Sequence, residues 1–141
     1  MPTSPPLRLR TSSVTVLLGH ADARRRVLDT LDEGSARCDS GHGVTTRRLV
    51  CGAAQPADER VRALAELVDD GCALLLADGP ATGLEGPARR CVLDALRAFS
   101  RTGVAVLVDD DDPVAVLSVA DAALRVLDDG SLQADDLQGP R

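Results

Sequence analysis

Residues 74–87 read LLLADGPATGLEGP and contain the signals that decide the fold. The apolar run from Leu74 to Ala77 has the continuous hydrophobicity of a strand that is covered on both faces. Asp78 follows at the carboxyl end of this run, a glycine-containing loop comes next, and Pro87 stands where a helix can begin. The segment therefore predicts a buried strand, a polar loop and a helix, in that order.

The same alternation of strand and helix extends in both directions along the chain. An alternating order favours a parallel sheet, because each helix must carry the chain back along a face of the sheet. We therefore predict an α/β fold, a three-layer domain of about five mainly parallel strands with helices on both faces. The predicted strands are Val14–Leu18, Arg48–Ala53, Ala73–Ala77, Val104–Val108 and Ala123–Leu127, and the predicted helices are Ala23–Leu31, Asp58–Val68, Pro87–Phe99 and Pro113–Ala120. The apolar faces of the second and third helices are expected to contain Val61, Leu64, Ala65, Val68, Val92, Leu93, Leu96 and Phe99.

One domain accounts for most of the chain. We expect it to span residues 10–132, after a flexible lead at 1–9 and before a polar tail at 133–141, with a surface loop at 32–43. The sequence around Asp128-Asp129-Gly130 is typical of a turn.

Composition narrows the classes of function. A net charge of −6 disfavours a nucleic-acid surface, where binding depends on basic side chains that displace counterions. Phe99 is the only aromatic residue, so a stacking platform for bases is also not expected. No apolar run approaches the roughly 18 residues of a membrane span, and the first ten residues do not resemble a signal peptide. We therefore expect a cytoplasmic protein without direct membrane insertion.

The cysteines and histidines do not form a metal-binding pattern. The four cysteines include no CxxC pair, which argues against a zinc site. Cys51, Cys72 and Cys91 lie in apolar segments and are expected to be buried. His20 and His42 are isolated in loops and are expected at the surface.

Residues 74–87 resemble the Walker B and D-loop region of ATP-binding cassette (ABC) domains. In the same register, Val14–Leu31 aligns with the strand, phosphate loop and helix of that family. The strand, Gly19 and the helix Val27–Leu31 are similar, whereas the phosphate-loop sequence is not preserved. Arg47–Gln55 resembles the strand that ends in the Q-loop glutamine, and Val104–Leu132 resembles the switch-histidine strand and the closing elements. The resemblance covers about residues 8–132. It implies a P-loop NTPase-like fold.

The resemblance also implies site residues, cofactors and partners. Gly19, Gln55 and the arginines Arg24, Arg25 and Arg26 would contact ATP, and Asp78 would bind Mg²⁺ through water. The partners implied are a second copy in a dimer or an ABC-type partner subunit, which would place the chain at the periphery of a membrane.

Several positions depart from the family pattern. Arg25 stands where the phosphate-loop Lys is expected and Arg26 where the Mg²⁺-binding hydroxyl is expected. Gly79 stands at the position of the catalytic Glu, and Asp111 at that of the switch histidine. The chain also lacks room for the family's helical subdomain and has no LSGGQ-type signature. We assign no catalytic residue, and binding of ATP and Mg²⁺ is expected to be weak or lost.

Three functions follow from this combination. The preferred one is a degenerate ABC-like domain that acts as a non-hydrolysing binding or regulatory partner. The second is an ATP-binding subunit of an ABC transporter that is active only with a partner chain. The third is a receiver-like, metal-dependent phosphotransfer domain with Asp78 as acceptor and Asp109–Asp112 as Mg²⁺ ligands.

Purely structural roles remain open for the same residues. Asp78 can pair with an arginine instead of binding a metal. The acidic run Asp109–Asp112 is expected to be a solvated loop and helix start, and Arg24–Arg26 can form a solvated first turn beside Asp22.

Overall fold

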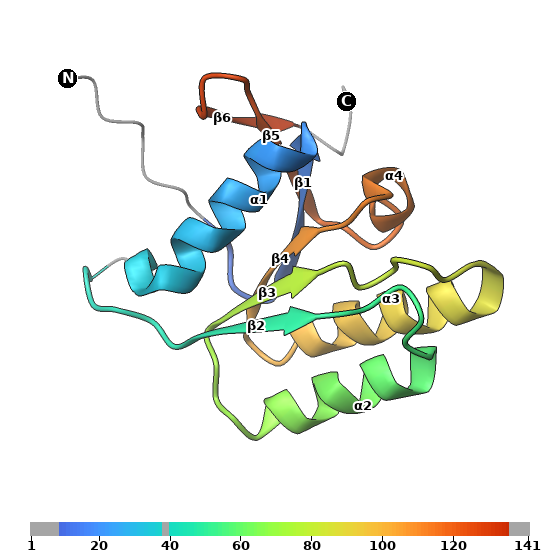
Figure 1. Cartoon of the computed structure of the whole chain (residues 1–141). Helices are drawn as coiled ribbons and strands as arrows, with labels where there is room; N and C mark the ends of the chain where they lie inside the picture. Colours follow the sequence, from blue (N-terminus) through green and yellow to red (C-terminus); the bar gives the residue numbers. More distant parts are fainter. Residues whose placement is uncertain (1–8, 38–39, 136–141) are drawn as a thin grey trace, which may run out of the picture.

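The computed structural model describes residues 9–37 and 40–135, which form a six-stranded sheet covered by helices on both faces (Figure 1). The strand order is β2-β3-β4-β1-β5-β6. All neighbouring strands are parallel except β6, which is antiparallel to β5. The α/β fold class is therefore confirmed. The strands are β1 (Ser13–Gly19), β2 (Thr46–Val50), β3 (Leu74–Asp78), β4 (Ala105–Asp109), β5 (Ala122–Val126) and β6 (Leu132–Asp135).

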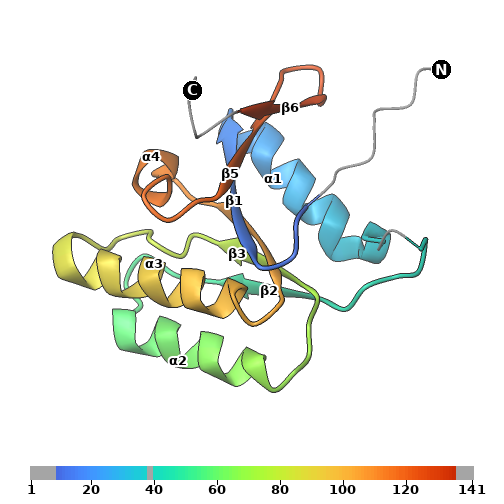
Figure 2. The same ribbon diagram turned by 180° about the vertical axis from the view of Figure 1, so that it is seen from behind.

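The sheet separates two hydrophobic core layers, each covered by helices. Helices α2 and α3 lie side by side on one face of the sheet, and α1 lies on the other (Figures 1 and 2). Because both faces are covered, every residue of β3 and β4 is buried, as their uninterrupted apolar sequences predict. The helices are α1 (Ala21–Thr30), α2 (Ala57–Val68), α3 (Gly86–Ser100) and α4 (Pro113–Val116), and a wide helical turn, Leu31–Ser35, extends α1.

The predicted face of α3 is confirmed, whereas the predicted face of α2 is partly wrong. Val92, Leu93, Leu96 and Phe99 are all buried in the core. In α2 the buried residues are Arg60 and Leu64, and the predicted core residues Ala65 and Val68 are exposed. Arg60 was not among the predicted core residues of α2, yet it is buried one helical turn before Leu64.

Two further elements differ from the predictions. Strand β6, Leu132–Asp135, was not predicted, and α4 ends at Val116 instead of Ala120.

Cys51 and Cys72 are buried as expected, but Cys91 is exposed, and Cys38 lies outside the described residues. Within the described residues, no helix combines the length and the apolar character required to cross a bilayer.

Candidate functional site

The candidate site lies at the carboxyl ends of β1, β3 and β4, where the resemblance places nucleotide phosphates. Open α/β sheets bind ligands at this edge because loops from several strands converge there. Gly19 ends β1, Asp78 ends β3 and Asp109 ends β4, and the last two are register neighbours. The structure therefore brings the predicted Gly19 and Asp78 to one edge of the sheet.

A helix occupies the segment that aligns with the family's phosphate loop. Helix α1 begins at Ala21, so His20 alone separates it from β1. The backbone N–H of Arg24 already donates to the carbonyl of His20 at 3.0 Å. Backbone amides that are engaged in a helix cannot also close around a phosphate. The loop that the resemblance implies between Gly19 and Arg26 is therefore not formed.

The consecutive arginines of α1 point in different directions because a helix rotates by about 100° per residue. Arg24 is buried, with its Nε 2.9 Å from an oxygen of Asp109, and its Nη1 donates to the carbonyl of Gly19 at 3.1 Å. Arg25 donates to both oxygens of Asp78, at 3.2 and 3.4 Å. Arg26 lines a cavity beside Val126, away from both carboxylates. The predicted solvated turn is thus wrong for Arg24.

Arg48 on β2 completes an ion-pair network around Asp78. Its Nη2 donates to Asp78 at 2.9 Å, and its Nη1 lies 2.7 Å from Asp29 and 3.3 Å from Asp32. The Arg48 side chain is 16% exposed and that of Asp78 is 10% exposed. Hydrogen bonding to Asp29 is the main reason why the pKa of Arg48 lies above its usual range. Asp78 is therefore held by guanidinium groups from both α1 and β2.

The acidic run after β4 is not the solvated loop that the sequence suggested. Asp109 and Asp110 are 5% and 1% exposed, whereas Asp111 and Asp112 are exposed. Burial raises the pKa of Asp109, although the charge of Arg24 opposes this effect. The prediction was thus correct for only the second half of the run.

Asp110 connects the loops that follow β3 and β4. Its oxygens accept hydrogen bonds from the backbone N–H groups of Ala81, at 2.7 Å, and Asp112, at 2.9 Å. Burial raises the pKa of Asp110 to about 6. The carboxyl group of Asp110 is therefore buried and bound to the backbone of both loops.

The loop after β3 is shaped by glycine. Gly79 has a φ of +71°, in the left-handed region that side chains disfavour. A Cβ there would lie 2.9 Å from Oγ1 of Thr82 and 3.2 Å from the carbonyl oxygen of Cys51. The position that corresponds to the family's catalytic Glu therefore cannot accept a glutamate without rearrangement of the loop.

Arg60 was not identified as a candidate from the sequence, although it is fully buried in the structure. Its guanidinium donates to the carbonyl oxygens of Gly52 at 2.7 Å, Gln55 at 3.0 Å and Pro80 at 2.9 Å. These carbonyls belong to the loops that follow β2 and β3. Arg60 therefore fixes the two loops relative to each other, and its position four residues before Leu64 is the signal that could have revealed it.

Gln55 and the histidines have local roles. The side-chain oxygen of Gln55 accepts from the backbone N–H of Gly52 at 3.3 Å, so this polar group is used within its own turn. His20 and His42 are exposed, as predicted. Nε2 of His20 lies 3.5 Å from Asp128 at the start of the β5–β6 turn.

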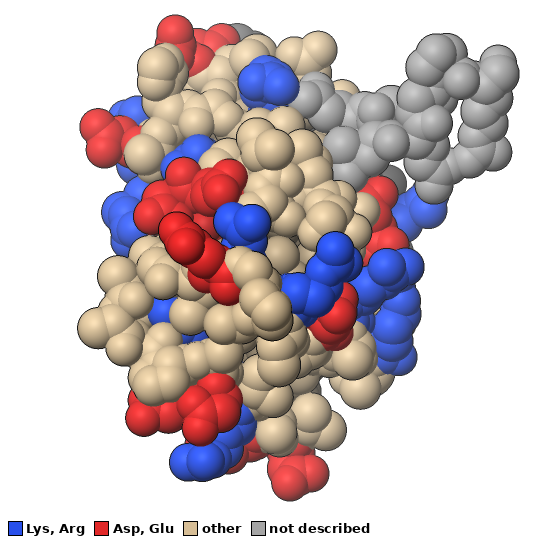
Figure 3. Space-filling model, turned by 90° about the vertical axis from the view of Figure 1, so that its right-hand side faces the viewer, with Lys and Arg blue, Asp and Glu red and all other residues tan. Residues whose placement is uncertain are grey.

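The residues present do not fit Mg²⁺ and a nucleotide. The carboxylate that would bind the metal through water accepts hydrogen bonds from Arg25 and Arg48, which already supply the balancing positive charge. Among the described residues, no group of three or more His, Cys, Asp or Glu side chains is arranged to hold a metal. Figure 3 shows acidic and basic side chains interspersed on the face seen from the right of Figure 1, where β2 and β3 end.

The comparisons with known proteins show a shared fold and no sequence family. No protein-family model matches the chain, and no curated protein matches it. A solved ATP-binding subunit of an ABC transporter superposes with a TM-score of 0.60 at 11% identity, covering 94% of this chain and 82% of the other. The chain shares its fold with this ATP-binding subunit. A metal-chelate type ABC transporter in an inward-facing conformation matches with a TM-score of 0.55 at 14% identity, over 91% of this chain and 73% of the other.

Proposed function

We propose that this chain is a degenerate ABC-like domain that acts as a binding or regulatory partner and does not hydrolyse ATP. The observation that carries the proposal is the pairing of Asp78 with Arg25 and Arg48. These arginines neutralise the carboxylate with protein groups, so a divalent cation would have to displace two guanidinium groups to reach it.

The proposal has two supporting observations. Helix α1 begins at Ala21 in place of a glycine-rich phosphate loop, so from Arg24 onward the backbone amides are engaged in the helix and cannot surround the β- and γ-phosphates. Gly79 stands at the position of the general base, and its left-handed conformation is unsuited to a side chain. Binding and hydrolysis are therefore both opposed by the local structure.

Calorimetric titration with Mg·ATP tests the proposal. We expect no saturable heat for the wild type, corresponding to a Kd above about 1 mM, and no release of phosphate in a parallel assay. Arg25→Ala removes the arginine at the Lys position, and Arg25→Lys restores the family's residue type at that position. Micromolar binding by the wild type that disappears in Arg25→Ala would contradict the proposal.

One observation favours the second candidate, an ATP-binding subunit that is active only with a partner chain. Arg25 contacts Asp78 but its side chain is 56% exposed, so it could turn toward a phosphate. Saturable Mg·ATP binding would support this function. The receiver-like alternative has less support, because Asp78 is buried and both of its oxygens accept hydrogen bonds from guanidinium groups.

We propose a cytoplasmic location, with peripheral membrane association through a partner subunit or action as a dimer. The fold shared with ABC subunits is the support for these assignments. Sedimentation velocity with and without Mg·ATP tests the dimer. A nucleotide-dependent shift from monomer to dimer would favour the ATPase candidate over the non-hydrolysing one.

A further inference from the structure

A cavity of about 490 Å³ opens between α3 and α4, and α4 lies above α3 in both Figure 1 and Figure 2. Its volume falls within the range of about 300–1,000 Å³ that is common for small-molecule sites. Neither Arg25 nor Asp78 lines this cavity. It is therefore separate from the ion-pair network of the candidate site.

The charge of the cavity between α3 and α4 comes from arginines. Arg89 and Arg90 line it, and among the described residues no aspartate or glutamate does. The two arginines precede Leu93, which also lines the cavity, by four and three residues. These spacings place all three side chains on one face of a helix. The wall formed by α3 is therefore cationic.

The two guanidinium groups are largely available to a ligand. Arg90 is exposed, and within residues 9–37 and 40–135 no acidic side chain forms an ion pair with it. Nη1 of Arg89 lies 3.5 Å from Asp112, which is long for a hydrogen bond. Asp112 also accepts from the backbone N–H of Ala115, at 3.3 Å, as the cap of α4. This carboxylate therefore offsets at most one of the two positive charges.

The wall formed by α4 presents an apolar side chain. Val114 lines the cavity and is 72% exposed, although it is a large apolar residue. Pro87 and Leu93 add apolar surface from α3. An apolar group in the cavity that contacts Val114 would remove both surfaces from water, which is favourable.

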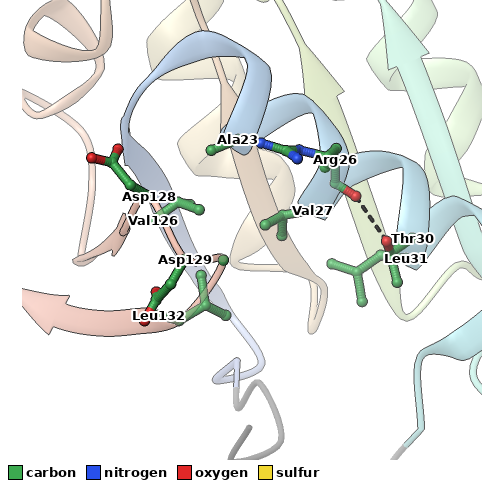
Figure 4. Close-up of a pocket in the computed structure, with 10 residues that line it drawn as sticks. Ala23, Arg26, Val27, Thr30, Leu31, Val126, Asp128, Asp129 and Leu132 are labelled. Carbon is green, nitrogen blue, oxygen red and sulfur yellow. Dashed lines mark hydrogen bonds between the residues drawn. The ribbon is translucent and has the colours of Figure 1, made fainter.

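A second cavity, between α1 and the turn that joins β5 to β6, has the opposite charge (Figure 4). Asp128 and Asp129 line it against the single Arg26. Its rim is therefore net negative. Of these two cavities, the one between α3 and α4 is the one whose charge suits an anion.

We propose that the cavity between α3 and α4 binds a small phosphate monoester, with its phosphate paired with Arg89 and Arg90 and its organic group against Val114. A monoester dianion matches the two positive charges, and its terminal oxygens can accept from both guanidinium groups at once. A carboxylate carries a single charge and satisfies fewer of these donors. The proposal does not depend on whether the chain binds ATP.

Calorimetry or NMR titration with phenyl phosphate, inorganic phosphate and benzoate tests the proposed ligand class. The titrations are made at constant ionic strength, without Mg²⁺, and at about pH 7.5, where a phosphate monoester is mainly a dianion. Phenyl phosphate should bind saturably and about tenfold more tightly than inorganic phosphate, because its ring covers Val114. It should also bind about tenfold more tightly than benzoate, because it accepts from a second guanidinium. Absence of saturable binding of phenyl phosphate, or equal affinity for phenyl phosphate and benzoate, would overturn the proposal.

Substitutions in the two walls test the assigned contacts. Arg90→Gln should weaken binding of phenyl phosphate about tenfold or more, as expected for loss of a charge-assisted hydrogen bond. Val114→Ser should weaken phenyl phosphate about threefold or more and leave inorganic phosphate unchanged. Arg62→Gln, at an exposed position of α2, changes the net charge by the same amount and should bind phenyl phosphate as the wild type does. Equal binding by Arg90→Gln and Arg62→Gln, with both variants folded by circular dichroism, would refute the role of Arg90.

Discussion

Replacement of Arg48 by alanine should destabilise the protein far more than the same change at the neighbouring Arg47. Both arginines lie on β2 and both form ion pairs, but only the Arg48 pair is largely shielded from solvent. Arg48 is 16% exposed and reaches Asp78, which is 10% exposed. Arg47 pairs with Asp70 at 2.6 Å, with side chains 47% and 41% exposed. The two variants therefore compare a shielded with a solvated pair on one strand.

The expected magnitude follows from the burial of Asp78. Removal of one partner of a buried ion pair typically costs about 3–5 kcal/mol, because the other charge remains buried. Arg25 still pairs with Asp78 in the variant, so we expect the lower end, about 3 kcal/mol. With a urea m-value of about 1–3 kcal/mol/M, the midpoint should fall by roughly 1–3 M. Arg47→Ala should leave the midpoint nearly unchanged, because solvated ion pairs contribute little.

Far-ultraviolet circular dichroism is the appropriate assay, since the chain contains no Trp and no Tyr to report unfolding by fluorescence. The double variant Arg48→Ala/Asp78→Ala completes a cycle, and a coupling free energy of about 0.5–3 kcal/mol is expected for residues in one network. If Arg48→Ala costs no more than Arg47→Ala, the network does not hold Asp78. The main support for a non-hydrolysing domain would then be lost.

Three further results are expected. Because burial raises the pKa of Asp110 from 3.8 to about 6, its stabilising contribution is present below about pH 4 and is lost as the pH rises through 6, a change of about 3 kcal/mol. Asp110→Asn should therefore flatten the dependence of unfolding free energy on pH across this interval, and an unchanged slope would contradict the assignment. Gly83→Ala should lower the thermal midpoint, because φ is +78° and a Cβ would clash with the carbonyl oxygen of Ala53; a midpoint equal to the wild type would show that the loop adapts. Mass spectrometry after brief alkylation should find Cys91 modified and the buried Cys51 and Cys72 protected, and rapid modification of either buried thiol would be inconsistent with this fold.

The local sequence patterns of β3, β4 and α3 were predicted correctly. The strands β3 and β4 are continuous apolar runs, and both faces of the sheet are covered in the structure. Helix α3 begins near Pro87 and buries residues at helical spacing up to Phe99. These features follow from periodicity and from the backbone preferences of proline, which a single sequence displays directly.

The start of α1 lies close to its predicted position. The sequence predicted a helix from Ala23, and the helix begins two residues earlier, at Ala21. Residues 21–26 contain neither glycine nor proline, and alanine and arginine are strong helix formers, so the local sequence favours a helix here. The helix can therefore begin almost directly after β1.

The partners of the charged groups could not be predicted, because they are set by strand register. Arg48 and Asp78 are 30 positions apart in the chain and meet only because β2 and β3 are paired neighbours. The burial of Asp110 likewise depends on how closely the loop after β3 approaches the loop after β4. One sequence does not specify either relationship.

Strand β2 lies at the edge of the sheet, and its arginines affect how readily the protein self-associates. This strand is the terminal one on its side of the sheet formed by the described residues, so its outer backbone groups could recruit a strand from another molecule. Arg47 and Arg48 place two cations on this margin, and their ion pairs with neighbouring aspartates hold them there. An incoming strand would have to desolvate or displace these charges, so the margin disfavours fibre-like stacking of one copy on the next.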